Sequence, residues 1–272
     1  MGGIDDSALQ EYAAYFSACN DAHTIRIEAT PHYLQFADKI ATLIHNTLPN
    51  VKLIFILREP ASRLFTGYRN LRELESNTYG SWTFDQFVKQ AIGFHESADH
   101  YAHDPRQRAA HYMHTGCYSK YLTTYLRVFD SSQICILFFD MLISSPQNFT
   151  TQAARFLQID DSFYNSYGFS QENRTRTFRS RTMHRLAFRV NQVFEPALNR
   201  YPALRRSLRN IYNQFNEAKS NKETPSAESM ELLYDLYRPH NLELRNLLHQ
   251  YGYTDNMPAW LASESDLDAS NS

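Results

Sequence analysis

The most informative hydrophobic pattern surrounds one short apolar run. Leu53 to Leu57 are all apolar and lie between Lys52 and Arg58. Because neither face of this run carries a polar residue, it predicts a strand buried on both faces of a parallel sheet. From Pro60 onward the apolar residues take helical spacing, and proline suits a first helical turn. We therefore predict a strand that ends at Arg58 and a helix N-terminus beside it, a combination that can bind phosphate at the ligand-binding edge of an α/β sheet.

The same periodicity predicts further elements. Alternation over Thr24–Glu28 and the apolar run Gln133–Phe139 indicate two more strands. The first of these, a helix and the strand at Leu53–Leu57 would form a right-handed βαβ unit. Apolar stripes predict helices over residues 8–16, 34–48, 60–74, 83–94, 116–129, 146–157 and 226–248, the last of them kinked or split at Pro239. These elements indicate an α/β fold with a parallel sheet.

Composition excludes several classes of protein. The chain has 272 residues, enough for one large α/β domain, and its net charge of −2 argues against a protein that coats nucleic acid. Three widely spaced cysteines, Cys19, Cys117 and Cys135, show neither zinc spacing nor a disulfide framework, so we predict buried free thiols. The sequence contains no transmembrane run and no signal-peptide pattern.

Residues 173–209 concentrate positive charge, with ten arginines and no lysine. Helical apolar spacing over residues 182–215 assigns most of these arginines to a solvated helix surface. Thr175–Arg181 precedes that spacing and lacks it, which leaves its arginines available to a ligand. RNA binding is the weaker alternative, because no RNP-type aromatic motif accompanies the run and the whole chain is not basic.

Residues 95–115 are rich in histidine. The five histidines are spaced by 5, 3, 8 and 3 residues and lack the carboxylate partners of a zinc helix. We therefore predict no metal site and interpret the segment as a loop over a substrate cleft. The histidines are His95, His100, His103, His111 and His114.

The residues around the first apolar run also resemble a known motif. Ile56–Tyr68 fits I-L-R-[DE]-P-x-x-R-x-x-[ST]-x-Y, which resembles the 3′-phosphate-binding segment of sulfotransferases that use 3′-phosphoadenosine 5′-phosphosulfate (PAPS). The similarity is greatest to the heparan-sulfate-type branch and its bacterial relatives. The resemblance implies that Arg58 and Thr66 bind the 3′-phosphate of the nucleotide. The alternative is that Arg58 only forms a salt bridge at a strand end.

Three further blocks resemble the family in the same order. Glu28–Tyr33 matches E-K-[ST]-P-x-Y except that Ala29 replaces the lysine, which puts heparan-sulfate-type specificity in doubt. The G-x-Y of Gly116–Tyr118 precedes a helix and a strand of matching length. The last helix and Trp260 match the family's C-terminal block. The resemblance implies a P-loop NTPase-like parallel sheet flanked by helices, with a largely helical C-terminal part.

The resemblance also assigns further binding residues. A family loop that closes over the nucleotide corresponds to Thr175–Arg181, so Arg179 and Arg181 are candidates for the 3′-phosphate. Tyr118, at the G-x-Y position, is a candidate neighbour of the nucleotide. A packed core tyrosine is an equally good interpretation of Tyr118.

One part of the family pattern is absent from the sequence. The family's first strand and its P-loop-like K-x-[GA]-[ST]-[ST] turn have no match, and no lysine precedes Lys39. The resemblance then implies a domain over residues 1–260 that is incomplete at its N-terminus. Acidic and serine-rich composition predicts a disordered tail over residues 261–272. The catalytic base stays unknown. Glu28 and His32 are possible replacements, and a local structural role is favoured for each.

We therefore expect a sulfotransferase that transfers a sulfuryl group from PAPS to a hydroxyl or amine of a carbohydrate or small molecule. A truncated sequence explains the missing turn better than real loss of activity, because an incomplete sheet would expose apolar edges. The alternative function is a non-catalytic module that binds nucleotide or anionic glycan. We expect no metal, no nucleic-acid partner and no membrane segment, and a cytoplasmic location, or the Golgi lumen if an anchor precedes the sequence.

Overall fold

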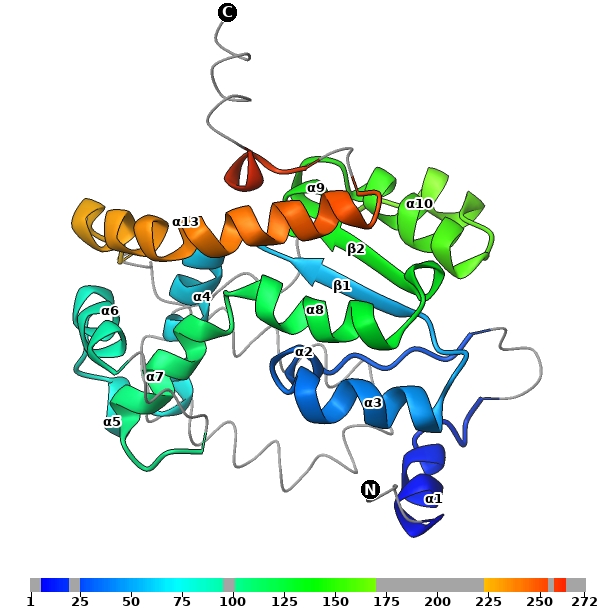
Figure 1. Cartoon of the computed structure of the whole chain (residues 1–272), viewed down its shortest axis with the longest axis horizontal. Coiled ribbons are helices and arrows are strands. Elements are labelled where there is room, and N and C mark those ends of the chain that lie inside the picture. Colours follow the sequence, from blue (N-terminus) through cyan, green and yellow to red (C-terminus); the bar gives the residue numbers. More distant parts are fainter. Residues whose placement is uncertain (1–5, 20–24, 95–100, 170–222, 254–256, 263–272) are drawn as a thin grey trace, which may run out of the picture. The chain divides into compact units, whose positions relative to one another are not determined.

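Two parallel strands form the sheet of this protein in a computed structural model that describes residues 6–19, 25–94, 101–169, 223–253 and 257–262. Strand β1 (Leu53–Leu57) pairs with β2 (Ile134–Phe138) in a register that runs from Leu53 opposite Ile134 to Leu57 opposite Phe138 (Figure 1). The predicted α/β class, a parallel sheet flanked by helices with a helical C-terminal part, is confirmed.

The chain divides into two compact units. The first contains residues 1–167 and 225–272, and the second contains residues 168–224. Almost all of the second unit, including the predicted arginine-rich helices, lies outside the described residues, so the elements below belong to the first. The prediction of one domain over residues 1–260 stays a prediction. Most of the predicted tail also lies outside the described residues, whereas Leu261 is buried.

Helices make up most of the described structure. Among the helices that the structure describes, none combines the length and the apolar composition that crossing a bilayer needs. The helices are α1 (Asp6–Ala14), α2 (His32–Gln35), α3 (Ala37–Thr47), α4 (Pro60–Leu74), α5 (Ser76–Tyr79), α6 (Phe84–Gly93), α7 (Pro105–His114), α8 (Tyr118–Val128), α9 (Phe139–Ser144), α10 (Pro146–Leu157) and α13 (Ala227–Gln250), with 3₁₀ turns η2 (Ser131–Gln133), η3 (Ser162–Asn165) and η4 (Ala259–Leu261).

One face of the sheet packs on a hydrophobic core formed by α3, α8, α13 and η4. Leu57, Ile136 and Phe138 contribute to this core from the two strands. The opposite face of β1 is not covered to the same extent, since Ile56 is 52% exposed. The prediction that the strand is buried on both faces is therefore wrong at Ile56. Side-chain alternation places Ile56 on the face away from the core, and apolar composition alone does not show which face helices cover.

The predicted strand at Thr24–Glu28 does not form. Residues 25–28 have no regular secondary structure, and Ile27 is 72% exposed. A strand needs a neighbour for its backbone hydrogen bonds, and both described strands pair with each other instead. The predicted βαβ unit therefore lacks its first strand, although its helix is present as α2 and α3.

A second core is made by helices alone. It is formed by α4, α6, α7 and α13 and includes Tyr68, Phe87 and Tyr237. Helix α6 begins as predicted at Thr83, whose hydroxyl accepts a hydrogen bond from the Gln86 N–H while the Gln86 side chain accepts one from the Thr83 N–H. These hydrogen bonds set the first turn of α6, and the ring of Phe87 packs against that of Tyr68 of α4 in the core.

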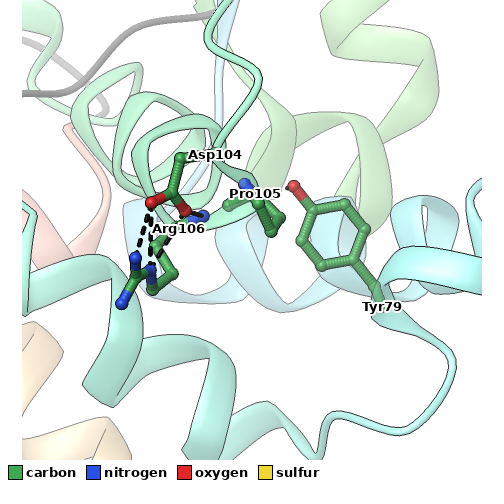
Figure 2. Close-up of polar contacts among 4 residues, drawn as sticks. All are labelled: Tyr79, Asp104, Pro105 and Arg106. Carbon is green, nitrogen blue, oxygen red and sulfur yellow. Dashed lines mark hydrogen bonds and ion pairs between the residues drawn. The ribbon is translucent and has the colours of Figure 1, made fainter.

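Helix α7 occupies part of the segment that the sequence predicts as a loop. Asp104 caps the helix by accepting the Arg106 N–H at 2.8 Å, and the Arg106 guanidinium also binds the Asp104 carboxylate (Figure 2). The Tyr79 hydroxyl, which points toward Pro105 in Figure 2, donates to the Pro105 carbonyl at 3.0 Å. The buried side of α7 includes Ala109, a small residue that gives hydropathy little contrast. The loop prediction is therefore wrong for residues 105–114.

Helix α13 runs uninterrupted for 24 residues through Pro239. It begins at Ser226, whose hydroxyl accepts the Ser229 N–H at 3.1 Å and donates to the Asp85 carboxylate at 2.8 Å. The predicted start is thus confirmed, and a split at Pro239 is not observed. The helix joins both cores, with Tyr237 in the helical core and Leu244 against the sheet.

The first helices bury less than predicted. Helix α1 overlaps the expected range of residues 8–16, although it begins and ends two residues earlier, and it buries no residue. Helix α3 buries Ala37 and Ala41, Ile44 packs against the same core while partly exposed, and Leu48 is exposed. Ala37 and Ala41 belong to the same core as residues of α8 such as Leu122, so small side chains of α3 face α8.

Candidate nucleotide-binding site

The candidate site is built around Arg58, the first residue after β1. The Tyr118 hydroxyl donates a hydrogen bond of 2.8 Å to the Arg58 carbonyl. Tyr118 is 3% exposed at the start of α8, and burial raises the pKa of its phenol, so the hydroxyl keeps its proton. This bond fixes the backbone where β1 gives way to α4. The bond matches the interpretation of Tyr118 as a core tyrosine, and it puts the Tyr118 hydroxyl in contact with the backbone of Arg58.

The Arg58 side chain lies over an aromatic ring. Its guanidinium carbon is 4.8 Å from the ring centroid of Phe139, the first residue after β2. Within the described residues, the guanidinium makes no hydrogen bond and no ion pair, so the salt-bridge alternative is not observed there. A ring face orients the planar guanidinium without using its N–H groups. Those N–H groups remain available to an anion at the carboxyl edge of the sheet.

The N-terminus of α4 is already occupied. The Glu59 carboxylate accepts hydrogen bonds from the Ala61 N–H at 2.8 Å and from the Ser62 N–H at 2.6 Å. These donors are the groups that the sequence suggests for a phosphate. Of the two predicted phosphate-binding groups, the guanidinium and the helix N-terminus, only the guanidinium is therefore open to a ligand, unless the ligand displaces Glu59.

Thr66 lies in the second turn of α4. Its hydroxyl donates to the Ser62 carbonyl at 3.0 Å, a local bond to the preceding turn. The hydroxyl must rotate away from Ser62 to donate to a phosphate. Thr66 thus sits on the predicted helix, and its present hydrogen bond is structural.

Arg63, the second arginine of the motif, has a role that we did not assign from the sequence. Its guanidinium donates to the Tyr112 carbonyl at 3.3 Å and to the Thr115 hydroxyl. Both acceptors belong to the C-terminal end of α7. Arg63 therefore ties α4 to α7, and its place in the motif was the only sequence signal for it.

The C-terminal segment returns to the carboxyl end of β2. The Trp260 indole N–H donates to the Asp140 carboxylate at 3.3 Å, and its ring contacts Phe138 and Tyr118. The Asn241 amide donates to the Trp260 carbonyl at 3.4 Å. These contacts give Trp260, which matches the family's C-terminal block, a structural role beside the candidate site, and Asn241 supports it from α13.

The two candidates for a base lie before and within α2. Both Glu28 and His32 are exposed, and Glu28 accepts a hydrogen bond from the Thr30 hydroxyl. His32 is hydrogen-bonded through Nδ1 to the Gln35 amide. Because no strand forms at residues 25–28, neither residue lies at a strand's carboxyl end as expected. Arg179 and Arg181 lie outside the described residues.

Two cysteines have raised pKa values, and the described residues contain no cluster of metal ligands. Across the described ranges, no group of three His, Cys, Asp or Glu side chains could hold a metal ion. The thiols of Cys117 and Cys135 are free, and burial raises the pKa of each to about 11. Such thiols are almost entirely protonated at neutral pH, so neither is a reactive nucleophile.

Two cavities lie elsewhere in the described structure. One of about 260 Å³ follows β2 and is lined by residues that include Cys135 and Tyr253. The other, of about 390 Å³, lies between α8 and α13 and is lined by residues that include Lys120 and Glu243. Neither of these two is lined by Arg58.

The model of the sulfotransferase family matches residues 4–163, which include β1, Arg58, Thr66 and Tyr118. The chain belongs to the sulfotransferase family. The solved sulfotransferase from Alicyclobacillus acidocaldarius is similar in fold, with a TM-score of 0.55 and 16% identity, over 96% of this chain and 81% of that one. The family and fold that the sequence motifs predict are therefore confirmed.

Curated relatives of this sulfotransferase-family chain are much longer. It is 24% identical over 220 residues to bifunctional heparan sulfate N-deacetylase/N-sulfotransferase 1 of Xenopus laevis. It is 23% identical over 219 residues to bifunctional heparan sulfate N-deacetylase/N-sulfotransferase 4 of Mus musculus. Each alignment covers 80% of this chain and 21% of the relative. The chain thus spans about a fifth of the length of these relatives.

Proposed function

We propose that this chain binds PAPS through Arg58 and transfers its sulfuryl group to a hydroxyl or amine. The observation that carries the proposal is the Arg58 guanidinium, held on the Phe139 ring at the sheet's carboxyl edge without another polar partner among the described residues. A guanidinium can form two parallel hydrogen bonds to one phosphate group. Family membership supports PAPS as the donor.

The other candidate residues each have a different role in binding the nucleotide. Tyr118 holds the backbone of Arg58, so the guanidinium starts from a fixed point. The Thr66 hydroxyl donates a hydrogen bond to the 3′-phosphate after it has rotated away from the Ser62 carbonyl. Arg179 and Arg181 are the proposed residues of a loop that closes over the nucleotide, an expectation that rests on the family resemblance alone.

The proposed reaction is an in-line transfer. A lone pair on the acceptor oxygen or nitrogen forms a bond to sulfur while the bond from sulfur to the phosphate oxygen of the donor breaks. Adenosine 3′,5′-bisphosphate leaves, and the acceptor proton passes to a base. Glu28 and His32 are the candidates for that base in this chain. The names of the heparan sulfate N-sulfotransferase relatives support a carbohydrate amine as the first acceptor to test.

Calorimetric titration with adenosine 3′,5′-bisphosphate tests the binding half of the proposal. Removing the charged donor with Arg58→Ala should weaken binding by about 1.5–3 kcal/mol, or about 10- to 150-fold. Arg155→Ala, which removes an exposed arginine of α10, is the matched control and should bind as the wild type does. An Arg58→Ala variant with wild-type affinity would contradict the assignment.

Incubation with labelled PAPS tests the transfer half. Label should appear on a carbohydrate amine or another acceptor, and the Arg58→Ala variant should transfer more slowly at limiting donor concentration. Nucleotide binding without transfer to any acceptor would favour the non-catalytic binding module. This result would leave the binding role of Arg58 standing and remove the enzymatic one.

A further inference from the structure

A carboxylate occupies the helix N-terminus beside the proposed phosphate-binding arginine. Glu59 follows Arg58 in the chain and is the N-cap residue of α4. One oxygen of its carboxylate accepts the Ala61 N–H at 2.8 Å, and the other accepts the Ser62 N–H at 2.6 Å. Because the backbone of α4 holds both oxygens, the side chain is clamped in this position. A negative charge is therefore fixed one residue from Arg58.

The charges of Glu59 and Arg58 act on the same part of the fold. Burial raises the pKa of the Tyr118 phenol, and the positive charge of Arg63 lowers it. Glu59 raises the same pKa, whereas Arg58 lowers it. On α13, the pKa of Tyr234 is raised by burial and by Glu59. The negative charge of Glu59 thus reaches α8 and α13 at the carboxyl end of β1, where Arg58 also lies.

A second carboxylate near the site has a different partner. Asp140 directly follows Phe139, whose ring lies 4.8 Å from the Arg58 guanidinium carbon. Its carboxylate accepts the Trp260 indole N–H at 3.3 Å, so it is bonded to the C-terminal segment and not to a helix N-terminus. Of these two carboxylates, only Glu59 takes backbone donors that a phosphate could use.

The blocked N–H groups determine which kind of anion the site accepts. A guanidinium and a free helix N-terminus side by side suit two phosphates that share a bridging oxygen, because each group binds one phosphate. With the Ala61 and Ser62 N–H groups bonded to Glu59, only the guanidinium is left, and a single phosphate needs nothing more. A second phosphate joined to the first and directed at α4 would meet a carboxylate instead of donors, and the negative charges would repel.

We propose that Glu59 is a specificity-determining residue that restricts the Arg58 site to an isolated phosphate group and rejects a chain of phosphates. This inference deepens the proposed function and rests on it. In adenosine 3′,5′-bisphosphate, the 3′-phosphate stands alone on its ribose carbon and the other phosphate is attached at the 5′ carbon. In ADP, two phosphates form a chain on the 5′ carbon. The two nucleotides carry the same number of phosphates and differ in whether these are joined.

A purely structural role for Glu59 makes a different prediction. An acceptor at this position stabilises α4 by bonding N–H groups that have no partner within the helix. Glu59→Gln keeps an oxygen that can accept one of these N–H groups and removes the charge. Glu59→Ser supplies a hydroxyl, which is a preferred cap, and also removes most of the side chain. If Glu59 only caps the helix, both variants change stability and leave the ligand preference as it is.

Calorimetric titration of the full chain with adenosine 3′,5′-bisphosphate and with ADP tests the proposal. The wild type should prefer the bisphosphate. In Glu59→Gln and Glu59→Ser this preference should fall about 5- to 100-fold, the range expected when the repulsion between two unit charges about 5 Å apart is lost. Glu73→Gln, which neutralises an exposed carboxylate farther along α4, is the matched control and should keep the wild-type preference. Adding Arg58→Ala to Glu59→Gln should abolish the gain in ADP affinity, because the guanidinium that holds the first phosphate is gone.

The possible results separate this inference from the proposed function. An unchanged preference in both Glu59 variants, or an equal loss of affinity for both nucleotides, would overturn the role in selectivity. A gain in ADP affinity that persists without Arg58 would overturn the link to the arginine.

If no protein binds the bisphosphate, the proposed function is wrong, and two probes without adenosine then test Glu59. Binding of an anion to the folded state raises the Tm. Pyrophosphate should raise the Tm of Glu59→Gln more than that of the wild type, whereas inorganic phosphate should raise both by similar amounts. Equal shifts of the two proteins with pyrophosphate would overturn the inference.

Discussion

Gly116, which separates α7 from α8, has a packing role that a single added methyl group would test. A Cβ at this position would lie 2.8 Å from Cε1 of Tyr237 and 3.0 Å from both Cζ and Oη. Tyr237 is fully enclosed, and its hydroxyl donates to the Met113 carbonyl at 2.8 Å. The ring cannot retreat without breaking that hydrogen bond, so Gly116→Ala forces strain into the helical core.

The expected cost follows from the size of the clash. Inserting one methyl group into a packed core typically destabilises by about 1–3 kcal/mol. If Tyr237 moves instead, the Met113 carbonyl loses its partner, at a similar cost of about 1–3 kcal/mol. Each kcal/mol corresponds to a fall in Tm of about 2–4 °C for a chain of this size class. We therefore expect Gly116→Ala to lower the Tm by about 2–12 °C.

Urea and thermal unfolding of four proteins would isolate the contact: the wild type, Gly116→Ala, Tyr237→Leu and the double variant. The alanine should cost less in the Tyr237→Leu background, because the clashing ring atoms are gone. Gly93→Ala is the matched control, since a Cβ there meets nothing within 4 Å and should be neutral or stabilising. An equal loss for Gly116→Ala in both backgrounds, or no loss at all, would refute the packing argument.

Two further variants and one alkylation experiment test contacts around the sheet and in the helical core. Tyr118→Phe leaves the Arg58 carbonyl without its hydrogen-bond donor. The free energy of unfolding in urea should fall by about 1–3 kcal/mol, and adenosine 3′,5′-bisphosphate should bind more weakly. If both quantities are unchanged, the hydroxyl does not have this role. Burial raises the pKa of Cys117 to about 11, so roughly one thiol in a thousand is ionised at pH 8. Cys117 should therefore react with iodoacetamide at pH 8 far more slowly in the folded protein than in guanidinium. Equal rates would contradict the burial. Lys52→Met removes the 2.6 Å hydrogen bond from Lys52 to the Phe156 carbonyl in the last turn of α10. The free energy of unfolding should fall by about 1 kcal/mol. A stability equal to that of the wild type would show that the bond contributes nothing.

The sequence predicted best where local chemistry determines the structure. Leu53–Leu57 reads as a strand because it is apolar throughout, and Pro60 suits the first turn of the helix that follows. The hydroxyl caps at Thr83 and Ser226 were predictable for the same reason, since a cap involves residues three positions apart. The position of Arg58 at the sheet edge follows from these local elements.

Predictions failed where the structure depends on contacts between residues that are distant in the sequence. The alternation at Thr24–Glu28 is typical of a strand, but no described strand pairs with it. Helix α7 buries alanines such as Ala109, so its apolar stripe is weak in the sequence. Helix α9 was not predicted because a single short turn follows β2 without a distinct pattern.

The site was predictable in its charged residue and not in its supporting contacts. The motif identified Arg58, whereas the stacking of its guanidinium on Phe139 depends on two chain segments that meet only in the fold. Glu59 satisfies the motif as an acidic residue, but its occupation of the helix N-terminus follows from backbone geometry.

The central claim is that Arg58 recognises the 3′-phosphate that distinguishes PAPS and its product from other adenine nucleotides. Calorimetry with adenosine 3′,5′-bisphosphate and with adenosine 5′-phosphate, on the wild type and on Arg58→Ala, measures this recognition directly. The wild type should prefer the bisphosphate, and Arg58→Ala should lose about 10- to 150-fold of that preference while its affinity for the 5′-phosphate changes little. The same preference in both proteins would show that the arginine does not bind the 3′-phosphate and would contradict the account.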